Sequence, residues 1–388
     1  MPDKPIYLDY NATTPIDHEV ADAMLPYLYE HFGNPSSAHP YGRAAREAVD
    51  RARDQVAALL NASPGEVVFT SGGTEANNMV IKGVAEAAGR GHIVTSAVEH
   101  PAVLEPCRWL AARGFEITVV GVDAKGRVDP GEVQAALRGD TILVSIMLAN
   151  NEVGTIQPVA EIARLAHERG ALMHTDAAQA VGKIPVDVQA LGVDFLSVAG
   201  HKLYAPKGVG ALYLRQGVEL PKFMHGAAHE RNRRAGTENV AQIAGLGMAA
   251  EIARRDMASG VAALRETRDR LYGALTARLD DIRRNGDPDN CLPNTLSLSF
   301  KGVQANVLVE RISSQVAASA GAACHADQVT VSTVLAAMDV PTEYAMGTLR
   351  LSTGRMTTTG EVDAAAAFIA EAVEALRAAK QEIWHDPA

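Results

Sequence analysis

Asp176 and Lys202, two ionisable residues in the middle of the chain, lie at or just beyond the ends of two short apolar runs. The runs 171–175 and 193–198 are typical of buried strands, and Lys202 follows the second within one turn. A carboxylate and an amine at two strand ends can hold pyridoxal phosphate (PLP). The lysine bonds the cofactor's aldehyde, and the carboxylate keeps the ring nitrogen protonated. Because each residue type is common at such places, the pair indicates PLP only in combination with further residues of one site.

A glycine-rich turn supplies a candidate phosphate site. Residues 67–70 form an apolar run, Gly73 and Thr74 follow it, and a helical pattern begins at about Ala76. A strand that passes through such a turn into a helix offers free backbone N–H groups and the positive end of the helix dipole to an anion. We therefore expect Gly73 and Thr74 to contact the phosphate of the cofactor.

Apolar runs alternate with helical patterns along most of the chain. This alternation predicts an α/β fold with a mostly parallel sheet covered by helices on both faces. Ligands in such folds lie outside the carboxyl ends of the strands, where the residues named above are expected. The predicted strands are 67–70, 92–96, 116–120, 141–147, 171–175, 195–198 and 210–214.

Composition excludes several classes of function. The 388 residues are 47% hydrophobic and 21% charged with a net charge of −10, which is typical of a soluble enzyme of about two domains and not of a non-specific nucleic-acid binder. No apolar run reaches the ~18 residues of a membrane span, and the first residues show no secretory pattern, so we expect a cytoplasmic protein without membrane attachment. The three cysteines have neither metal-ligand nor disulfide-framework spacing, so no metal site is expected.

The combination of DAAQ at 176–179 with GHK at 200–202 resembles the fold-type I PLP enzymes. Within them it resembles the NifS-like group of cysteine desulfurases and selenocysteine lyases. The resemblance spans nearly the whole chain and implies a large PLP-binding domain, 16–255, and a smaller α+β domain formed by 1–15 and 256–388. Further matching motifs are DYNATTP, TSGGTEANN, EHPAV, NNEVG, RRAGTEN and LRLSTGR.

The resemblance implies roles for the residues of the PLP site. Lys202 bonds the cofactor and then removes the Cα proton of the substrate, and Asp176 pairs with the ring nitrogen. Gln179 hydrogen-bonds the ring hydroxyl, His100 stacks on the ring, and Asn151 contacts both cofactor and substrate. His201, beside the lysine in GHK, is expected to contact the cofactor as well.

A polar loop at 223–239 carries a basic cluster, Arg231, Arg233 and Arg234. The resemblance implies that this loop reaches a neighbouring subunit and that Thr237 contacts the phosphate bound there, which predicts a homodimer. His225 and His229 stand where the group usually has GGGQE, and their role cannot be deduced from the sequence.

The resemblance places the nucleophile at Cys324, among the small residues of a flexible loop, where protonated His325 would favour the thiolate. Cys324 is expected to take sulfur from L-cysteine as a persulfide, leaving L-alanine, and to pass it to an acceptor protein. Arg355, in LRLSTGR, is expected to bind the substrate carboxylate, because a planar guanidinium matches it with two hydrogen bonds.

Departures from the desulfurase pattern leave the substrate open. The chain has SAGAACH where SSGSAC is usual, and Ala199 stands in place of a phosphate-binding serine; both are closer to selenocysteine lyases. Ser332, eight residues after Cys324, instead keeps the desulfurase spacing. L-cysteine and L-selenocysteine therefore both remain candidate substrates, with a selenium acceptor in the second case. A transaminase, a C–C lyase and a non-catalytic PLP-binding regulator are the alternatives of the same fold.

Overall fold

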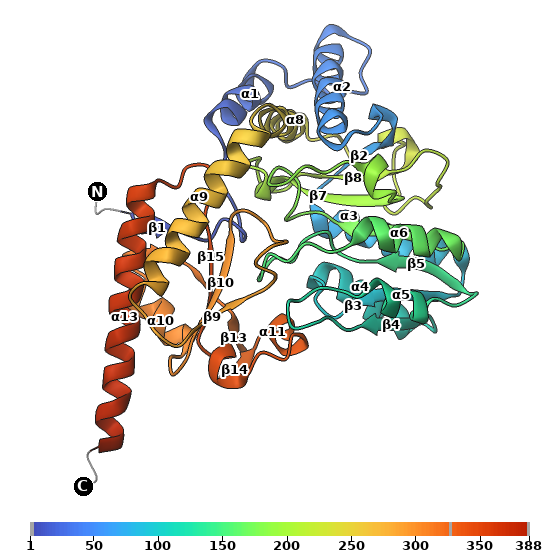
Figure 1. Cartoon of the computed structure of the whole chain (residues 1–388). Coiled ribbons are helices and arrows are strands. Elements are labelled where there is room, and N and C mark those ends of the chain that lie inside the picture. The colour runs from blue at the N-terminus through green and yellow to red at the C-terminus, as the bar shows by residue number, and fades with distance from the viewer. Residues whose placement is uncertain (1–3, 326–327, 386–388) are drawn as a thin grey trace.

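The structure is a computed structural model that describes residues 4–325 and 328–385, with the backbone alone at 322–325, 328–330 and 380–385. Figure 1 shows a large sheet with its helices on one side of the molecule and a smaller sheet beside it, flanked by the long C-terminal helix. In the described part of the chain, no helix is long and apolar enough to cross a membrane.

Seven strands form the large sheet. The strand β8 is antiparallel to both of its neighbours and all other pairs are parallel, so six strands share one direction and their carboxyl ends meet at one edge. This arrangement confirms the predicted α/β class. The order is β2 (Val67–Thr70), β8 (Gly210–Leu214), β7 (Phe195–Ala199), β6 (Leu172–Asp176), β5 (Thr141–Ser145), β3 (His92–Ser96) and β4 (Glu116–Val120).

Both faces of this sheet are covered, which explains why its central strands are apolar without interruption. Successive side chains of a strand point to opposite faces. Phe69 and Leu196 accordingly belong to one hydrophobic cluster, with α2, α5, α6 and α8, whereas Val68 and Phe195 belong to another, with α3 and α4. The bounds are α2 (Pro40–Leu60), α3 (Gly73–Ala88), α4 (Pro101–Ala111), α5 (Pro130–Ala136), α6 (Val159–Glu168) and α8 (Val240–Arg255).

A second hydrophobic core lies around an antiparallel sheet of four strands. The N-terminal strand β1 pairs with β11 next to this core, to which Leu8 contributes a fully buried side chain. The predicted domain boundaries at residues 15 and 255 stay a prediction. The elements are β1 (Ile6–Tyr7), β11 (Val316–Ala317), the sheet β12 (Ser319–Ala320), β15 (Thr348–Ser352), β10 (Thr295–Phe300) and β9 (Ile282–Asn285), and the helices α9 (Met257–Thr276), α10 (Ala305–Ile312) and α13 (Thr359–His385).

The segment that carries Cys324 is a β-hairpin, whereas the sequence predicted a flexible loop. The strand β13 (Ala322–His325) pairs antiparallel with β14 (Gln328–Val331), and Cys324 lies opposite Val329. The β-branched residues of QVTV favour an extended backbone and explain the pairing. The side chain of Cys324 lies outside the described part. The remaining elements are α1 (His18–Tyr29), α7 (Val188–Leu191), α11 (Thr333–Ala337), α12 (Thr342–Ala345) and three short 3-10 turns, 64–66, 200–202 and 230–232.

Candidate active site

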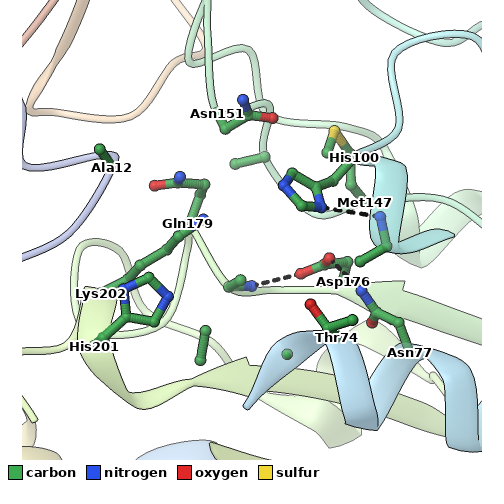
Figure 2. A pocket seen from close by; sticks show the side chains of 15 residues that line it. Ala12, Thr74, Asn77, His100, Met147, Asn151, Asp176, Gln179, His201 and Lys202 are labelled. Carbon is green, nitrogen blue, oxygen red and sulfur yellow. Dashed lines mark hydrogen bonds between the residues drawn. The ribbon is translucent and has the colours of Figure 1, made fainter. Parts of the chain in front are cut away.

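A cavity of about 190 Å³ opens at the carboxyl edge of the large sheet. Apart from Ala12 of the N-terminal segment, its lining residues lie at or after the carboxyl ends of the strands β2, β3, β5, β6 and β7, whose parallel course brings five separate loops to one place. Figure 2 shows their side chains around this common space. Eight residues predicted from the sequence line the cavity: Gly73, Thr74, His100, Asn151, Asp176, Gln179, His201 and Lys202.

Asp176 ends β6 and is 7% exposed. One of its carboxylate oxygens accepts a hydrogen bond from the Ala178 N–H at 2.9 Å, and the other accepts from Asn77 Nδ2 at 2.7 Å. These two donors hold the carboxylate at the floor of the cavity. Asn77 was not predicted from the sequence, although it lies one helical turn after Gly73 in the TSGGTEANN motif, and that spacing puts both residues on one helix face.

Lys202 ends a 3-10 turn, Gly200–Lys202, that follows β7 directly. Burial lowers the pKa of Lys202, nearby Asp176 opposes the shift, and the positive charge of Arg350 adds to it. A lowered pKa makes the amine a proton acceptor nearer neutral pH. Thr14 holds the turn in place, since its hydroxyl donates to the His201 carbonyl at 3.0 Å and accepts from the Tyr204 N–H at 2.9 Å.

Burial lowers the pKa of both histidines of the cavity, which favours their neutral forms. Burial and the nearby Lys202 lower the pKa of His100, whose Nδ1 accepts a hydrogen bond from the Ala102 N–H at 3.1 Å as the N-cap of α4. With Nδ1 occupied as an acceptor, the ring proton is on Nε2. Burial and neighbouring lysines, Lys202 foremost, lower the pKa of His201 to about 4. His100 therefore offers a flat neutral ring to the cavity.

The helix after the glycine turn begins three residues earlier than the sequence predicted. The helix α3 begins at Gly73, not at about Ala76, because Gly72 takes a φ of 150° at the N-cap. The N–H groups of Gly73 and Thr74 are therefore among the first of the helix, which have no acceptor within it. Ala199 lines the cavity with a methyl group and supplies no hydroxyl donor.

Thr237 does not line the cavity and its side chain is exposed. The loop that carries it is fastened to its own chain by two ion pairs. Arg53 and Glu230 form a buried bidentate pair with two contacts of 2.8 Å, and Arg234 binds Glu75 at 2.8 and 3.2 Å. The predicted phosphate contact of Thr237 thus finds no counterpart within one chain and stays a prediction.

Arg355 does not line this cavity, and its predicted contact with the substrate carboxylate stays a prediction. Its guanidinium lies 3.9 Å from the ring centre of Tyr204 and 3.2 Å from the Asp17 carboxylate. Its backbone N–H donates to the Tyr204 hydroxyl at 2.7 Å. Arg355 therefore supports the turn that follows Lys202. The motif LRLSTGR contains a second arginine, Arg350, which contacts a residue of the cavity.

Arg350 is the arginine next to the cavity. It lies within β15, and its Nη1 donates to the backbone carbonyl of Asn151, a cavity residue, at 3.3 Å. Its Nη2 donates to Asp9 at 2.8 Å and to Ser319 at 3.0 Å. Its Nε, like that of Arg355, is buried without a hydrogen-bond partner among the described residues, so the guanidinium retains a donor for a ligand.

A second cavity of about 380 Å³ adjoins the first, since Asn151 lines both. Gly321 and Val331, at the two ends of the Cys324 hairpin, also line it. Ser332 caps α11 immediately after the hairpin, and its hydroxyl donates to the Glu152 carboxylate at 2.5 Å. The hairpin with the candidate nucleophile therefore begins and ends at a cavity that shares Asn151 with the cavity around Lys202.

Comparison with known proteins identifies the family. The model of the class-V aminotransferases matches residues 6–365. The chain belongs to this family. It is 48% identical to the cysteine desulfurase IscS of Dictyoglomus turgidum over 96% of this chain and 95% of that protein, and 46% identical to that of Methanosarcina thermophila over 96% and 93%.

Solved structures of this class-V family resemble the chain over nearly its full length. A NifS-like protein superposes with a TM-score of 0.89 at 37% identity and covers 96% of this chain and 99% of its own. The structure of SspA in complex with cysteine gives 0.81 at 35% identity, with 92% and 100% covered.

The class-V enzymes that the chain matches depend on PLP, and the cavity fits that cofactor chemically. Asp176 supplies a carboxylate for the ring nitrogen, Lys202 an amine for the aldehyde, and the start of α3 an anion site. These groups belong to one cavity, with the neutral ring of His100 among them.

Proposed function

We propose that this chain is a cysteine desulfurase, which removes sulfur from L-cysteine and releases L-alanine with the help of PLP. The observation that carries the proposal is the cluster of Lys202, Asp176 and His100 in one cavity, which adjoins a second cavity at the Cys324 hairpin. Its support is near-half identity over 96% of the chain to proteins named cysteine desulfurase.

The direct test is an assay of the purified PLP-loaded protein with L-cysteine and a thiol reductant. Equal amounts of alanine and sulfide are expected, without a keto-acid acceptor. Alanine formation that requires a keto acid would indicate a transaminase, and bound PLP without any turnover would indicate a regulator. The same assay with L-selenocysteine, compared by kcat/KM, measures the preference between the two substrates.

The residues that would hold PLP come from separate loops. Lys202 would bond its aldehyde, Asp176 would face its ring nitrogen, and Gly73 and Thr74 would bind its phosphate. His100 would lie against the ring, with Gln179 at the ring oxygen and His201 and Asn151 at its margin. When bound, PLP supplies an electron sink for the pair released from the Cα–H bond.

The chain's own groups perform the proton and sulfur steps. Lys202, with its lowered pKa, takes the Cα proton, and the lowered pKa of His100 favours the neutral imidazole. The Cys324 thiolate then bonds to the substrate sulfur while the Cβ–S bond breaks. The electron pair of that bond stays with the alanine fragment, which takes up a proton, and the sulfur remains on Cys324 as a persulfide.

Arg350 is proposed in place of Arg355 as the ligand of the substrate carboxylate. Arg350→Ala is expected to lower kcat/KM for L-cysteine about 100-fold, mainly through KM, because a charge-assisted contact worth about 3 kcal/mol is lost. Arg355→Ala is the matched variant from the same motif, expected to change KM less than about fivefold. Steady-state kinetics of both variants decide between them: a larger KM effect at Arg355 would restore the role first predicted for it.

A homodimer is proposed because Thr237 is exposed and does not line the cavity of its own chain. Apolar side chains that are exposed over residues 25–41 are consistent with an interface in this region. Their exposed fractions are 46% for Leu25, 53% for Leu28, 74% for Tyr29, 70% for Phe32 and 57% for Tyr41. A cytoplasmic location and a sulfur-acceptor protein as a partner remain predictions from the sequence.

Mixed dimers test the contribution of Thr237 to a neighbouring site. Lys202→Ala and Thr237→Ala subunits, each impaired alone, are unfolded together and refolded as a mixture. If Thr237 acts across the dimer, half of the molecules gain one intact site, and about a quarter of the normal activity returns. No recovery above the separate variants, or an active monomer in sedimentation, would contradict the proposal.

A further inference from the structure

Lys183 is a buried cation beside the cavity to which none of the roles above is assigned. It is 5% exposed, and its Nζ lies 2.7 Å from Gln179 Oε1 and 3.2 Å from Asn11 Oδ1. Both of these partners are amide oxygens. Lysine is seldom buried unless an acidic group pairs with it, and burial with the nearby charges of Lys202 and Arg350 lowers the pKa of Lys183 well below its usual value. The amine has at least two N–H donors in either protonation state, and two of them match the two oxygens.

The contact with Lys183 distinguishes the two ends of the Gln179 amide. An amide has an acceptor oxygen and a donor nitrogen of nearly equal shape, so its neighbours decide which end faces a ligand. Lys183 donates to the oxygen of Gln179, and the nitrogen donates to the backbone carbonyl of Asn11 at 2.9 Å. A rotated amide would turn its N–H groups towards the donors of Lys183. The second N–H of Gln179 is therefore left for the cavity that this side chain lines (Figure 2).

Asn11 is itself fixed from the small sheet, which makes the arrangement rigid. Its Nδ2 donates to the Thr295 hydroxyl at 2.8 Å and to the Asn151 carbonyl at 3.1 Å. Its Oδ1 accepts from Asn294 at 3.0 Å as well as from Lys183. Asn11 is 1% exposed, so water does not compete for these bonds. The side-chain oxygen of Asn11 that accepts from Lys183 therefore has a single orientation.

We propose that Lys183 is a positioning residue that orients the Gln179 amide, so that Gln179 donates a hydrogen bond to the ring oxygen of PLP. The inference rests on the proposed contact between Gln179 and that oxygen. A donor there stabilises negative charge on the oxygen and tightens cofactor binding. Without Lys183 only the hydrogen bond to the Asn11 carbonyl orients the amide, so the amide presents its oxygen to the cofactor for part of the time.

A double-mutant cycle with Lys183→Met and Gln179→Leu tests the proposal through binding of PLP to the apoprotein. Each single variant is expected to raise the Kd of PLP about tenfold, since one oriented hydrogen bond is lost. The double variant is expected to stay within about twofold of Gln179→Leu, because Lys183 acts through that residue. The absorbance of bound PLP, titrated against pH, should shift its midpoint upward in both single variants and no further in the double variant.

Two measurements separate orientation from a purely structural role. Lys183→Gln keeps an N–H donor, and its Kd is expected to lie closer to that of the unmodified protein than the Kd of Lys183→Met does. Thermal unfolding of the apoproteins reports on the fold. A lower unfolding temperature of Lys183→Met with unchanged Kd and absorbance would overturn the proposal, as would a Kd raised about 100-fold in the double variant.

The cycle is independent of cysteine turnover. If the unmodified protein binds PLP but releases no alanine, the desulfurase function fails while the cycle still measures the role of Lys183. If Gln179→Leu leaves Kd and absorbance unchanged, the contact of Gln179 with the cofactor is refuted, and the role of Lys183 with it.

Discussion

Cys324→Ala is expected to abolish the release of alanine from L-cysteine, with kcat/KM reduced at least about 1,000-fold. A thiol is a poor leaving group, so its sulfur must be removed by a nucleophile, and the hairpin at the second cavity carries the proposed one. The measurement is alanine formed in the presence of a thiol reductant. Mass spectrometry of the unmodified protein, taken before reduction, should also show one added sulfur on the peptide with Cys324.

Selenocysteine and a second cysteine provide the controls for this variant. A selenol is more acidic and its C–Se bond is weaker, so Cys324→Ala should retain part of its turnover of L-selenocysteine. Cys291→Ala removes a partly exposed thiol elsewhere and should leave both activities near normal. Burial raises the pKa of the remaining Cys107 thiol to about 12, which keeps it unreactive. Undiminished cysteine turnover in Cys324→Ala would refute the persulfide mechanism.

Lys202→Ala is expected to remove the covalent bond to PLP and to lower kcat at least about 10,000-fold, because one side chain both holds the cofactor and takes the Cα proton. The absorbance of the bound cofactor should change from that of a lysine-linked to that of a free aldehyde. Borohydride reduction followed by peptide mapping should find PLP on Lys202 of the unmodified protein and on no lysine of the variant.

Lys207→Ala is the matched control, because Lys207 is exposed in the same loop and lines no part of the cavity. It should retain the absorbance of the lysine-linked cofactor and the activity. A Lys202→Ala protein with a reducible bond between PLP and another lysine would contradict the assignment. Lys183, the buried lysine bonded to Gln179, is the residue to examine first in that case.

Hydrophobic periodicity was sufficient to predict the large sheet, and motif spacing together with the family resemblance predicted eight of the residues that line its cavity. All seven predicted strands are present, with ends displaced by at most two residues. A strand whose sheet is covered on both faces must be apolar without interruption. Each such strand can therefore be recognised from its own short sequence. Because parallel strands end at one edge, residues that follow separate strands, such as Asp176 and Lys202, could be expected to meet. The cavity collects them together with six other predicted residues.

The tertiary structure alone decided the contacts between distant segments. Arg350 and Arg355 share one motif, and only the pairing of β15 with β10 and β12 places the first beside Asn151. Lys183 and Asn11 are far apart in sequence and meet through a hydrogen bond that no local pattern predicts. A hydrogen bond depends on positions known to a fraction of an ångström, whereas periodicity determines only which face of an element is buried. For this reason the sequence could predict which loops form the site, and the packing of the two sheets decided which side chains complete it.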